Sequence, residues 1–354
     1  MNRPLYGPLF LGLVMHFDRT WRADEATLDQ PLRWKKPKRI FVCAHGDLFH
    51  EKVPDAWIDR VFAVMAIAPQ HTFQVLTKRP ERMREYITHA CGRVADAVQP
   101  LRADDRPVAP LPHLDGGMRW WPLPNVWLGV SVEDQATAAA RIPHLLATPA
   151  AVRFLSAEPL MGPINLRRLR VAPDHHTMVD ALDGYAIVDT PGRERERAAL
   201  HWVIVGGESG PGARPMHPDW ARSLRDQCAT AGVPFFFKQW GEWALTSGVD
   251  VYCHGPNRNE RAHPHADGIS WLKDGRVCLR DFPVEQHKNR MDRGEATSTR
   301  AVEVDHTALA DFNRMVEDLS RAEDNPLGYC WMYRIGKSAA GRLLDGALHD
   351  GWPG

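Results

Sequence analysis

The sequence predicts an α/β fold, a partial (β/α) TIM-like barrel in which buried parallel strands alternate with helices. Three observations predict it. Six short apolar segments recur between Ile40 and Gly241, and they lack the polar alternation of strands that face water. A segment with helical periodicity follows nearly every one of them. The chain has no dinucleotide-binding fingerprint and no P-loop, which favours a barrel over a doubly wound nucleotide-binding sheet.

The predicted strands are apolar runs that end in polar loops: residues 40–43, 72–76, 126–130, 152–155, 202–205 and 233–237. The predicted helices between them cover residues from about 55 to 66, 81 to 88, 135 to 146 and 218 to 231. Pro69 ends the first helix. Gly232 ends the last, because glycine adopts the left-handed conformation of a helix C-cap without steric cost. In such βαβ units, ligands bind at the carboxyl ends of the strands.

Two polar stretches interrupt this barrel region, residues 39–243, and are predicted to be insertions. Residues 92–124 contain six prolines among charged residues, as surface loops do. Residues 167–199 form the second polar insertion. Trp120 and Trp121 return the first insertion to the body of the protein, and for them packing is favoured over stacking on a nucleic-acid base.

Two less regular parts flank the barrel region. Residues 1–38 are predicted to be an N-terminal segment, with a strand over residues 9–15. The basic run 33–39 is interpreted as a solvated approach to a strand, with phosphate contact as the alternative. Residues 244–354 are predicted to be an irregular and helical C-terminal extension. Its expected elements are strands near 270–272 and 276–279, a helix over 307–321 and a last short helix to which the tail segment 333–342 leads.

Composition and cysteine usage predict a cytoplasmic protein. Lysine plus arginine equal aspartate plus glutamate at 44 each, so no global field favours nucleic acid or membrane. The six cysteines are scattered and include no Cys-x-x-Cys pair, as expected of thiols in a reducing compartment. The apolar run 9–14 is too short to span a bilayer, so no membrane partner is predicted.

Polar and charged residues collect where the predicted strands end. They are Asp47, Lys78, Arg79, Ser131, Glu133, Glu158, Gly206, Gly207, Glu208, Ser209, Lys238 and Gln239. The carboxyl ends of parallel strands meet at one mouth of a barrel. There, carboxylates fit the ammonium and hydroxyl groups of a zwitterionic ligand, Lys78 or Arg79 fits its carboxylate, and the glycines let the backbone approach it. The alternative is an ion network that neutralises itself and closes the barrel.

Two further groups are weaker candidates. A cysteine–histidine group consists of Cys253, His254, His263 and His265. These residue types bind zinc, but their spacing matches no zinc signature and favours a histidine-rich surface loop. His45 and His50 flank Asp47, where a general acid or base would fit, although a loop histidine with satisfied hydrogen bonds is the favoured interpretation. No nucleophile elbow and no zincin helix is present in the sequence.

Seven motifs resemble one family. They are DLFHE (47–51), LTKRPERM (76–83), WLGVSVEDQ (127–135), LSAEPL (155–160), VGGESG (205–210), FKQWG (237–241) and GRLLDG (341–346). Over about residues 28–243 and the C-terminal tail, the sequence resembles the phage and prophage family called Gp-thirty-seven/Gp-sixty-eight, a domain of unknown function. Taken together, the motifs are highly specific.

The resemblance implies a partial barrel of the radical-SAM type, whose mouth binds S-adenosylmethionine (SAM). Glu208 would hold the ammonium group of SAM, and Glu133 and Lys78 would also contact the ligand. It further implies a [4Fe–4S] cluster held by an N-terminal three-cysteine segment in fuller members. A separate three-Cys-motif partner protein and modification of a macromolecule, such as a nucleic acid, are implied as well.

This sequence departs from that pattern, because it has no cysteine before Cys43 and so lacks the three-cysteine segment. Two interpretations stay open, a degenerate family member and an N-terminally truncated gene model. In the truncated case the first barrel strand is missing, and residues 40–43 form an open edge for residues 9–15 to cover.

Three functions are therefore compared. The first is a SAM-binding enzyme of the radical-SAM type, provided that an upstream cluster-binding segment exists. The second is a cluster-free protein that binds a ligand or a partner without catalysis. The third is a metal-dependent barrel hydrolase that uses His45, Asp47 and the cysteine–histidine group.

Overall fold

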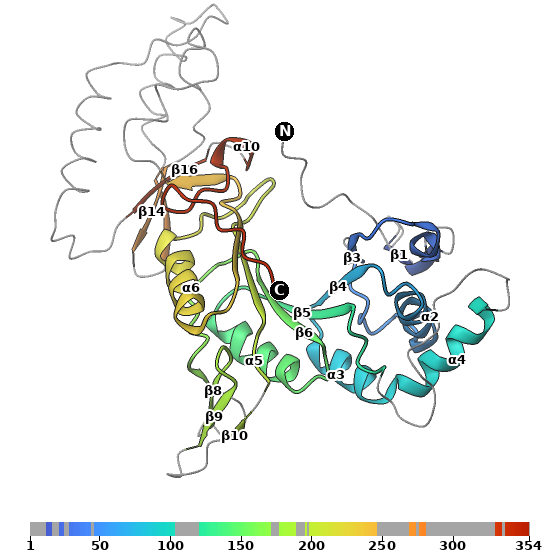
Figure 1. The fold of residues 1–354 in the computed structure, drawn as a ribbon. Coiled ribbons are helices and arrows are strands. Elements are labelled where there is room, and N and C mark those ends of the chain that lie inside the picture. Colours follow the sequence, from blue (N-terminus) through green and yellow to red (C-terminus); the bar gives the residue numbers. More distant parts are fainter. Residues whose placement is uncertain are drawn as a thin grey trace, which may run out of the picture.

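The computed structural model shows an α/β fold around a curled six-stranded parallel sheet that forms half of a barrel (Figure 1). The structure describes residues 12–15, 21–24, 28–43, 46–102, 120–170, 177–188, 195–196, 198–245, 269–273, 276–280, 330–334 and 337–353. The six strands of the half-barrel are β3 (Arg39–Val42), β4 (Thr72–Thr77), β5 (Val126–Val132), β6 (Val152–Ala157), β11 (Trp202–Gly206) and β12 (Phe235–Gln239).

The order of these strands agrees with the predicted partial barrel. Across the sheet the order is β3-β4-β5-β6-β11-β12, which is also their order along the chain. Every neighbouring pair is parallel. A doubly wound sheet reverses its direction of growth once, whereas a barrel adds each strand on the same side of the last. Each of the six strands predicted from the sequence overlaps an observed one.

Five helices flank the half-barrel on its outer side (Figure 1). They are α2 (Asp55–Ala66), α3 (Pro80–His89), α4 (Cys91–Arg102), α5 (Gln135–Leu146) and α6 (Pro218–Ala231). Their apolar residues form the main core with outward-facing strand residues such as Leu128 and Val205. Helix α5 begins after Asp134, whose carboxylate accepts a hydrogen bond from the backbone N of Thr137 at 2.8 Å. Helix α6 ends at Gly232, which has a φ of +69°.

The prediction of a surface loop over residues 92–124 is wrong for its first part, which belongs to helix α4. Val94 and Val98 are fully buried on one face of α4, where the helix packs against α2. They lie four residues apart, which is the spacing of an amphipathic helix. Pro100 lies in the last turn of α4, and the helix accommodates it there.

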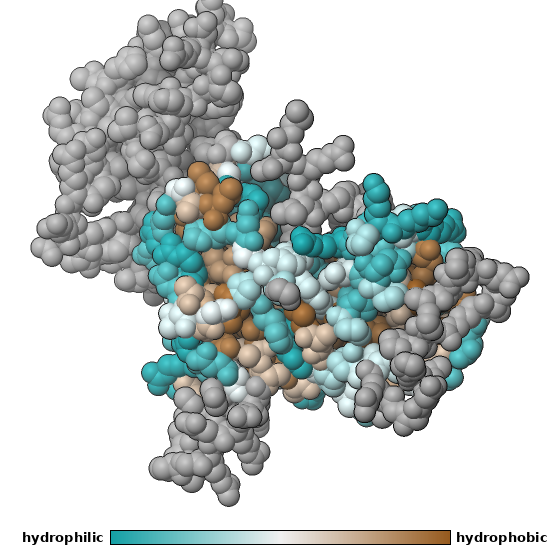
Figure 2. Space-filling model, viewed as in Figure 1, coloured by the Kyte–Doolittle hydropathy of each residue, from teal (hydrophilic) through white to brown (hydrophobic). Residues whose placement is uncertain are grey.

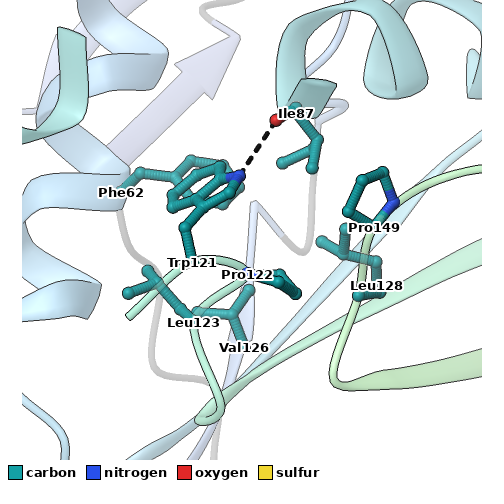
Figure 3. Close-up of a pocket in the computed structure, with 9 residues that line it drawn as sticks. Phe62, Ile87, Trp121, Pro122, Leu123, Val126, Leu128 and Pro149 are labelled. Atoms are coloured by element: carbon teal, nitrogen blue, oxygen red, sulfur yellow. Dashed lines mark hydrogen bonds between the residues drawn. The ribbon is translucent and has the colours of Figure 1, made fainter. Parts of the chain in front are cut away.

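Trp120 and Trp121 pack onto the helices, as the sequence favoured. Trp120 is only 3% exposed. The indole N–H of Trp121 donates to the carbonyl of Ile87 at 3.0 Å, and its ring centroid lies 5.8 Å from that of Phe62. An apolar cavity of about 10 Å³ adjoins Trp121 on the helix side of the sheet (Figure 3). Such a cavity holds at most one water molecule, so it is a packing defect and not a ligand site.

The described parts of the insertion over residues 167–199 include a small antiparallel sheet. Its strands are β7 (Leu169–Arg170), β8 (Thr177–Asp180), β9 (Tyr185–Val188) and β10 (Arg195–Glu196), in the order β10-β9-β8-β7. Arg167 ties this sheet to its turn, because its guanidinium pairs with Asp180 at 3.0 Å and with Asp183 at 2.6 Å.

The N-terminal strand does not cover the edge of the half-barrel. β1 (Gly12–Met15) pairs with β2 (Trp21–Asp24) in an antiparallel hairpin, and a 3-10 helix, η1 (Gln30–Arg33), precedes β3. The expectation that residues 9–15 cover β3 is therefore contradicted for the part described, residues 12–15. Within the described chain, β4 is the only strand that pairs with β3.

The C-terminal part contains more β-structure than the predicted irregular and helical extension. β13 (Trp243–Leu245), β14 (Ile269–Lys273), β15 (Arg276–Arg280) and β16 (Cys330–Arg334) form an antiparallel sheet in the order β13-β16-β14-β15. β14 and β15 are the two strands predicted near 270–272 and 276–279. The short helix α10 (Lys337–Ala340) follows β16. The helix predicted over 307–321 lies outside the described residues.

A second apolar cluster lines the inner face of the half-barrel. It consists of Trp127, Phe154, Trp202, Ile204 and Phe236, with Leu76, Val152 and Trp352 packed against it. Gly129 makes room for this cluster, because a Cβ at that position would lie 2.5 Å from the ring of Phe154. The cluster is the apolar floor of the half-barrel.

Residues 349–352, which we call the C-terminal strap, hold Trp352 on this floor. The strap pairs with β12, since Phe237 N donates to His349 O and Gly351 N donates to Phe235 O, each at 2.9 Å. The ring of Trp352 lies 4.3 Å from that of Trp202, centroid to centroid. Trp202 is the first residue of β11, so the strap closes the amino-terminal end of the half-barrel and leaves the carboxyl-terminal end for a site.

Candidate functional site

Along four strands of the half-barrel, β4, β5, β6 and β12, the side chains on the inner face change from apolar to charged. Because successive strand residues point to opposite faces, every second residue of a strand lines the inner face. On β5 these inward residues are Trp127, Gly129 and Ser131, followed by Glu133 just after the strand, and on β6 they are Val152, Phe154 and Ser156, followed by Glu158. On β4, Leu76 is followed by Lys78, and on β12, Phe236 is followed by Lys238. The carboxyl ends of β4, β5, β6 and β12 thus place Lys78, Glu133, Glu158 and Lys238 at one end of the half-barrel, and Lys238 reaches Glu158 across β11. We call this set the mouth.

Glu133 is held from two sides. Lys78 Nζ lies 2.5 Å from Glu133 Oε1, and Arg141 Nη1 of helix α5 lies 2.9 Å from Glu133 Oε2. The same guanidinium nitrogen of Arg141 donates to the carbonyl of Ser131 at 2.7 Å. Arg141 lies in no sequence motif that would have identified it as a partner of Glu133. Its role depends on the packing of α5 against β5.

Glu158 is the carboxylate of the mouth with an available acceptor. Its Oε2 accepts from Lys238 Nζ at 3.1 Å and from Ser156 Oγ at 3.4 Å, while its side chain is 17% exposed. Among the described residues, none donates a hydrogen bond to Oε1. The backbone carbonyl of Glu158 accepts from Ser131 Oγ at 3.2 Å, which links β5 to β6 at this end.

The two glycines of the Gly-Gly-Glu motif make room for other groups. A Cβ on Gly206 would lie 2.5 Å from Glu158 Oε1. A Cβ on Gly207 would lie 1.8 Å from the carbonyl oxygen of Trp240. Gly207 N also donates to the carbonyl of Gln239 at 2.9 Å, and the Gln239 side chain is buried. The glycines therefore allow close packing of the β11 and β12 ends, which the sequence could not distinguish from close approach to a ligand.

Glu208 is turned toward its own loop. Both carboxylate oxygens are engaged by Arg214, with Nε–Oε2 at 2.8 Å and Nη2–Oε1 at 3.0 Å, and Arg214 N donates to Oε2 at 2.8 Å. These hydrogen bonds with Arg214 hold the pKa of Glu208 below its usual range. Ser209, next to it, is exposed. Glu208 therefore stabilises the loop 208–214.

This pair gives a pH-dependent prediction. Because the folded-state pKa of Glu208 is lowered, its stabilising effect is present above the usual glutamate pKa of about 4.3 and is lost as the pH falls through the lowered value. We expect Glu208→Gln to reduce the free energy of unfolding by about 1 kcal/mol at pH 7, since Arg214 is largely exposed, and by much less at pH 3. Urea denaturation at both pH values measures this. An equal loss at both would contradict the assignment.

Asp47 and Arg79 connect the loop after β3 to the loop after β4 through hydrogen bonds and an ion pair. Asp47 Oδ1 accepts from Thr77 Oγ1 at 2.7 Å and from Phe49 N at 2.9 Å. Its Oδ2 accepts from Lys78 N and from Arg79 Nη1, each at 3.0 Å. These four donors fill the acceptor capacity of a carboxylate. The structure thus brings both predicted residues beside the mouth, in a role that ties the end of β3 to the end of β4.

Sequence reasoning missed Gln74, a buried polar residue of β4. Its side chain is 2% exposed, and within the described chain its Nε2 has no hydrogen-bond partner. It shares the inner face of β4 with Leu76, and in the register of the sheet it is opposite Trp127. The signal in the sequence is a single polar residue within an apolar strand.

The described residues do not fit a [4Fe–4S] cluster. Cys43, Cys91 and Cys228 lie after β3, in α4 and in α6. Burial, followed by the charge of Asp47, raises the pKa of Cys43 to about 12, which disfavours the thiolate that iron requires. In the part of the chain that the structure describes, no three Cys, His, Asp or Glu side chains form a group that could hold a metal ion.

The histidine predictions are mostly untested. His45 and the cysteine–histidine group 253–265 lie outside the described residues. His50 is described: its Nδ1 accepts from Lys52 N at 3.1 Å, and its Nε2 lies 3.5 Å from Glu51. This is the pattern of a loop histidine with satisfied hydrogen bonds, the favoured interpretation.

No helix among the described residues is both long enough and apolar enough to cross a bilayer.

Comparisons with known proteins place the chain in a family without giving it a function. No curated protein matches the sequence, and no solved structure matches it. A family model described as "Protein of unknown function (DUF5131)" matches residues 9–353, which is nearly the whole chain. The chain therefore belongs to the DUF5131 family of proteins of unknown function.

Proposed function

We propose that the mouth of the half-barrel binds SAM, or a ligand with the same zwitterionic amino-acid end, as part of an enzyme that modifies a macromolecule. One observation carries the proposal: four strands of the half-barrel bring two carboxylates and two ammonium groups to one end of an apolar inner face. SAM combines an ammonium, a carboxylate and a sulfonium with a nucleoside. The charges at the mouth are complementary to the first three, and the apolar floor below them suits a flat base.

Glu158 is the best placed residue for the ammonium group. Among the described residues none donates a hydrogen bond to its Oε1, and its partner Lys238 is 43% exposed. Because the Lys238 side chain is long and 43% exposed, its ammonium can return to water when a ligand ammonium takes its place beside Glu158. The released lysine, or Lys78, then pairs with the ligand carboxylate. This revises the expectation from the resemblance that Glu208 holds the ammonium, since Arg214 already occupies both oxygens of Glu208.

The proposal assigns binding and orientation of the ligand to this chain. Bound SAM would supply an activated methyl or adenosyl group. Among the described residues no three side chains form a group that could hold an iron–sulfur cluster, and the proposal assigns no radical step to these residues. The resemblance to a phage family supports a macromolecular substrate and a separate three-Cys-motif partner, and both belong to the proposal. A cluster-free binding protein, without catalysis, uses the same mouth and the same ligand.

The experiment is a calorimetric titration of SAM into the wild type, Glu158→Gln and a control, Glu85→Gln. Glu85 is an exposed carboxylate on α3. We expect Glu158→Gln to weaken binding at least about tenfold, because a hydrogen bond to a charged group contributes about 1.5–3 kcal/mol and each tenfold is about 1.4 kcal/mol. Glu85→Gln should bind like the wild type. Equal affinities for all three proteins would contradict the proposal and favour a self-neutralising ion network.

A further inference from the structure

A second charged surface lies at the opposite end of the half-barrel from the mouth. Residues 33–39 contain five cations in seven positions, and no acidic residue. Lys35, Lys36 and Arg39 are exposed, while Lys38 is half-buried. We call these four residues the basic strip. They precede or begin β3, which spans four residues and roughly 13 Å, so the strip is at the amino-terminal end of the sheet edge. Figure 2 shows hydrophilic surface over the segment that leads into β3.

The charges of the basic strip are not neutralised within the described chain. No described carboxylate lies within 4.0 Å of Lys35, Lys36, Lys38 or Arg39, whereas the neighbouring Arg33 pairs with Asp29 at 3.0 Å. The other arginines of the half-barrel mostly have acidic partners: Arg79, Arg82, Arg93, Arg141, Arg214, Arg222, Arg225 and Arg342 all form ion pairs. A cluster of cations with no acidic partner among the described residues produces a local positive field on a protein of zero formal net charge.

Tryptophan rings hold two of these cations in place. Lys38 Nζ lies 4.0 Å from the ring centroid of Trp34, and Arg39 Cζ lies 4.0 Å from the ring centroid of Trp352 in the C-terminal strap. A guanidinium that stacks on an indole keeps the N–H groups at its edge for an oxyanion. The aromatic rings thus hold the two cations in position without neutralising their charge.

His71 fixes the backbone of the segment that carries the strip. It is buried, its Nδ1 accepts from Lys38 N at 3.1 Å, and its Nε2 lies 3.0 Å from Pro31 O. Trp34 packs edge-on against its ring, with the centroids 5.8 Å apart. Burial lowers the pKa of His71, so the ring is neutral near pH 7, and Nε2–H then donates to Pro31. The strip is therefore presented by a pre-organised segment, which lowers the entropy cost of binding.

We infer that the basic strip binds the phosphate backbone of a nucleic acid. Cations interleaved with aromatic residues fit a phosphodiester chain with stackable bases. An anionic membrane is a less suitable partner, because segments that bind a membrane surface combine their cations with exposed apolar residues. Within the described chain, the exposed large hydrophobic side chains are Leu343 and Leu348, and neither belongs to the basic strip. The inference does not rest on SAM binding at the mouth. If both hold, the nucleic acid is the macromolecule that the proposed enzyme modifies.

The test is fluorescence anisotropy of a labelled 20-nucleotide RNA, the same sequence as single-stranded DNA, and a DNA duplex, titrated with the full chain. The variant is Lys35→Ala/Lys36→Ala. The control, Arg168→Ala/Arg170→Ala, removes two exposed cations without described acidic partners at the start of the small sheet β7–β10. Because all four side chains are exposed, thermal midpoints should stay unchanged. A SAM titration of the lysine variant separates this inference from the proposed function, and it should match the wild type.

We expect the wild type to bind at least one of the three probes at 50 mM salt and the lysine variant to bind about tenfold more weakly. The slope of log K against log salt should decrease in magnitude by about 1.4 to 1.8, which corresponds to two lost phosphate contacts. The control should bind like the wild type. Two results of the titrations would overturn the inference: no binding by the wild type, or an equal loss of affinity in the lysine variant and the control. A third would be displacement of the nucleic acid by vesicles with 30% anionic lipid, or by polyglutamate, at charge concentrations below that of the nucleic acid.

Discussion

Replacing Gly207 with alanine is expected to destabilise the protein by more than about 4 kcal/mol, which is exceptional for one methyl group. The added Cβ would lie 1.8 Å from the carbonyl oxygen of Trp240 and 2.6 Å from its carbonyl carbon. Both contacts are with backbone, so no side-chain rotation relieves them. Relief requires separation of the loops after β11 and β12, which breaks the hydrogen bond from Gly207 N to Gln239 O. Urea denaturation followed by circular dichroism measures the change.

Gly210→Ala is the matched control in the same loop. Gly210 has a φ of +100°, but a Cβ there would meet nothing within 4 Å. Only the backbone strain of about 1–2 kcal/mol is then expected. If Gly207→Ala destabilises the protein no more than Gly210→Ala does, the close packing of the β11 and β12 ends is not as described.

The second large effect is expected for Trp352→Ala in the C-terminal strap. Trp352 packs on Trp202 and Trp127 of the apolar floor and carries the Arg39 guanidinium on its ring. Its loss opens the floor at the amino-terminal end of the half-barrel and removes a contact that joins the two edges of the sheet. We expect a decrease of about 2–4 kcal/mol in the free energy of unfolding, toward the lower part of the range for buried tryptophans because the ring is partly exposed.

Leu348→Ala is the control for the strap. The Leu348 side chain lies next to the strap and is 55% exposed, so its truncation should change stability by less than about 0.5 kcal/mol. Chemical denaturation of Trp352→Ala and Leu348→Ala under the same conditions measures both changes in the free energy of unfolding. Similar effects of the two substitutions would mean that the strap is not part of the folded core.

Much of the half-barrel follows from the sequence, because local patterns determine its elements. Uninterrupted apolar runs such as 202–205 identify buried strands, and Gly232 marks the end of a helix. The helix α4 was missed because the prolines in its last turn and after it outweighed the one-turn spacing of Val94 and Val98. The pairing of β1 with β2 was missed for a different reason, since the choice of strand partner is a tertiary property that periodicity does not contain.

The residues of the mouth were predictable as a set, but not their partners. Strand ends indicate that Lys78, Glu133, Glu158 and Lys238 lie together. The sequence separations of 55 between Lys78 and Glu133 and of 80 between Glu158 and Lys238 give no hint of which lysine meets which carboxylate. The orientation of Glu208 was equally hidden, because it depends on how the loop 208–214 folds back. The basic run was visible in the sequence, whereas its Trp352 contact depends on the C-terminal strap.

The measurement that tests the central claim most directly is photolabelling of the protein with methyl-tritiated SAM, followed by peptide mapping. We expect label, displaced by excess unlabelled SAM, in peptides that contain the strand ends around Glu133, Glu158 or Lys238. Peptides of the C-terminal strap should stay unlabelled, because the strap closes the other end of the half-barrel. Label confined to the strap or the basic strip, or no label above that of heat-denatured protein, would contradict a SAM site at the mouth.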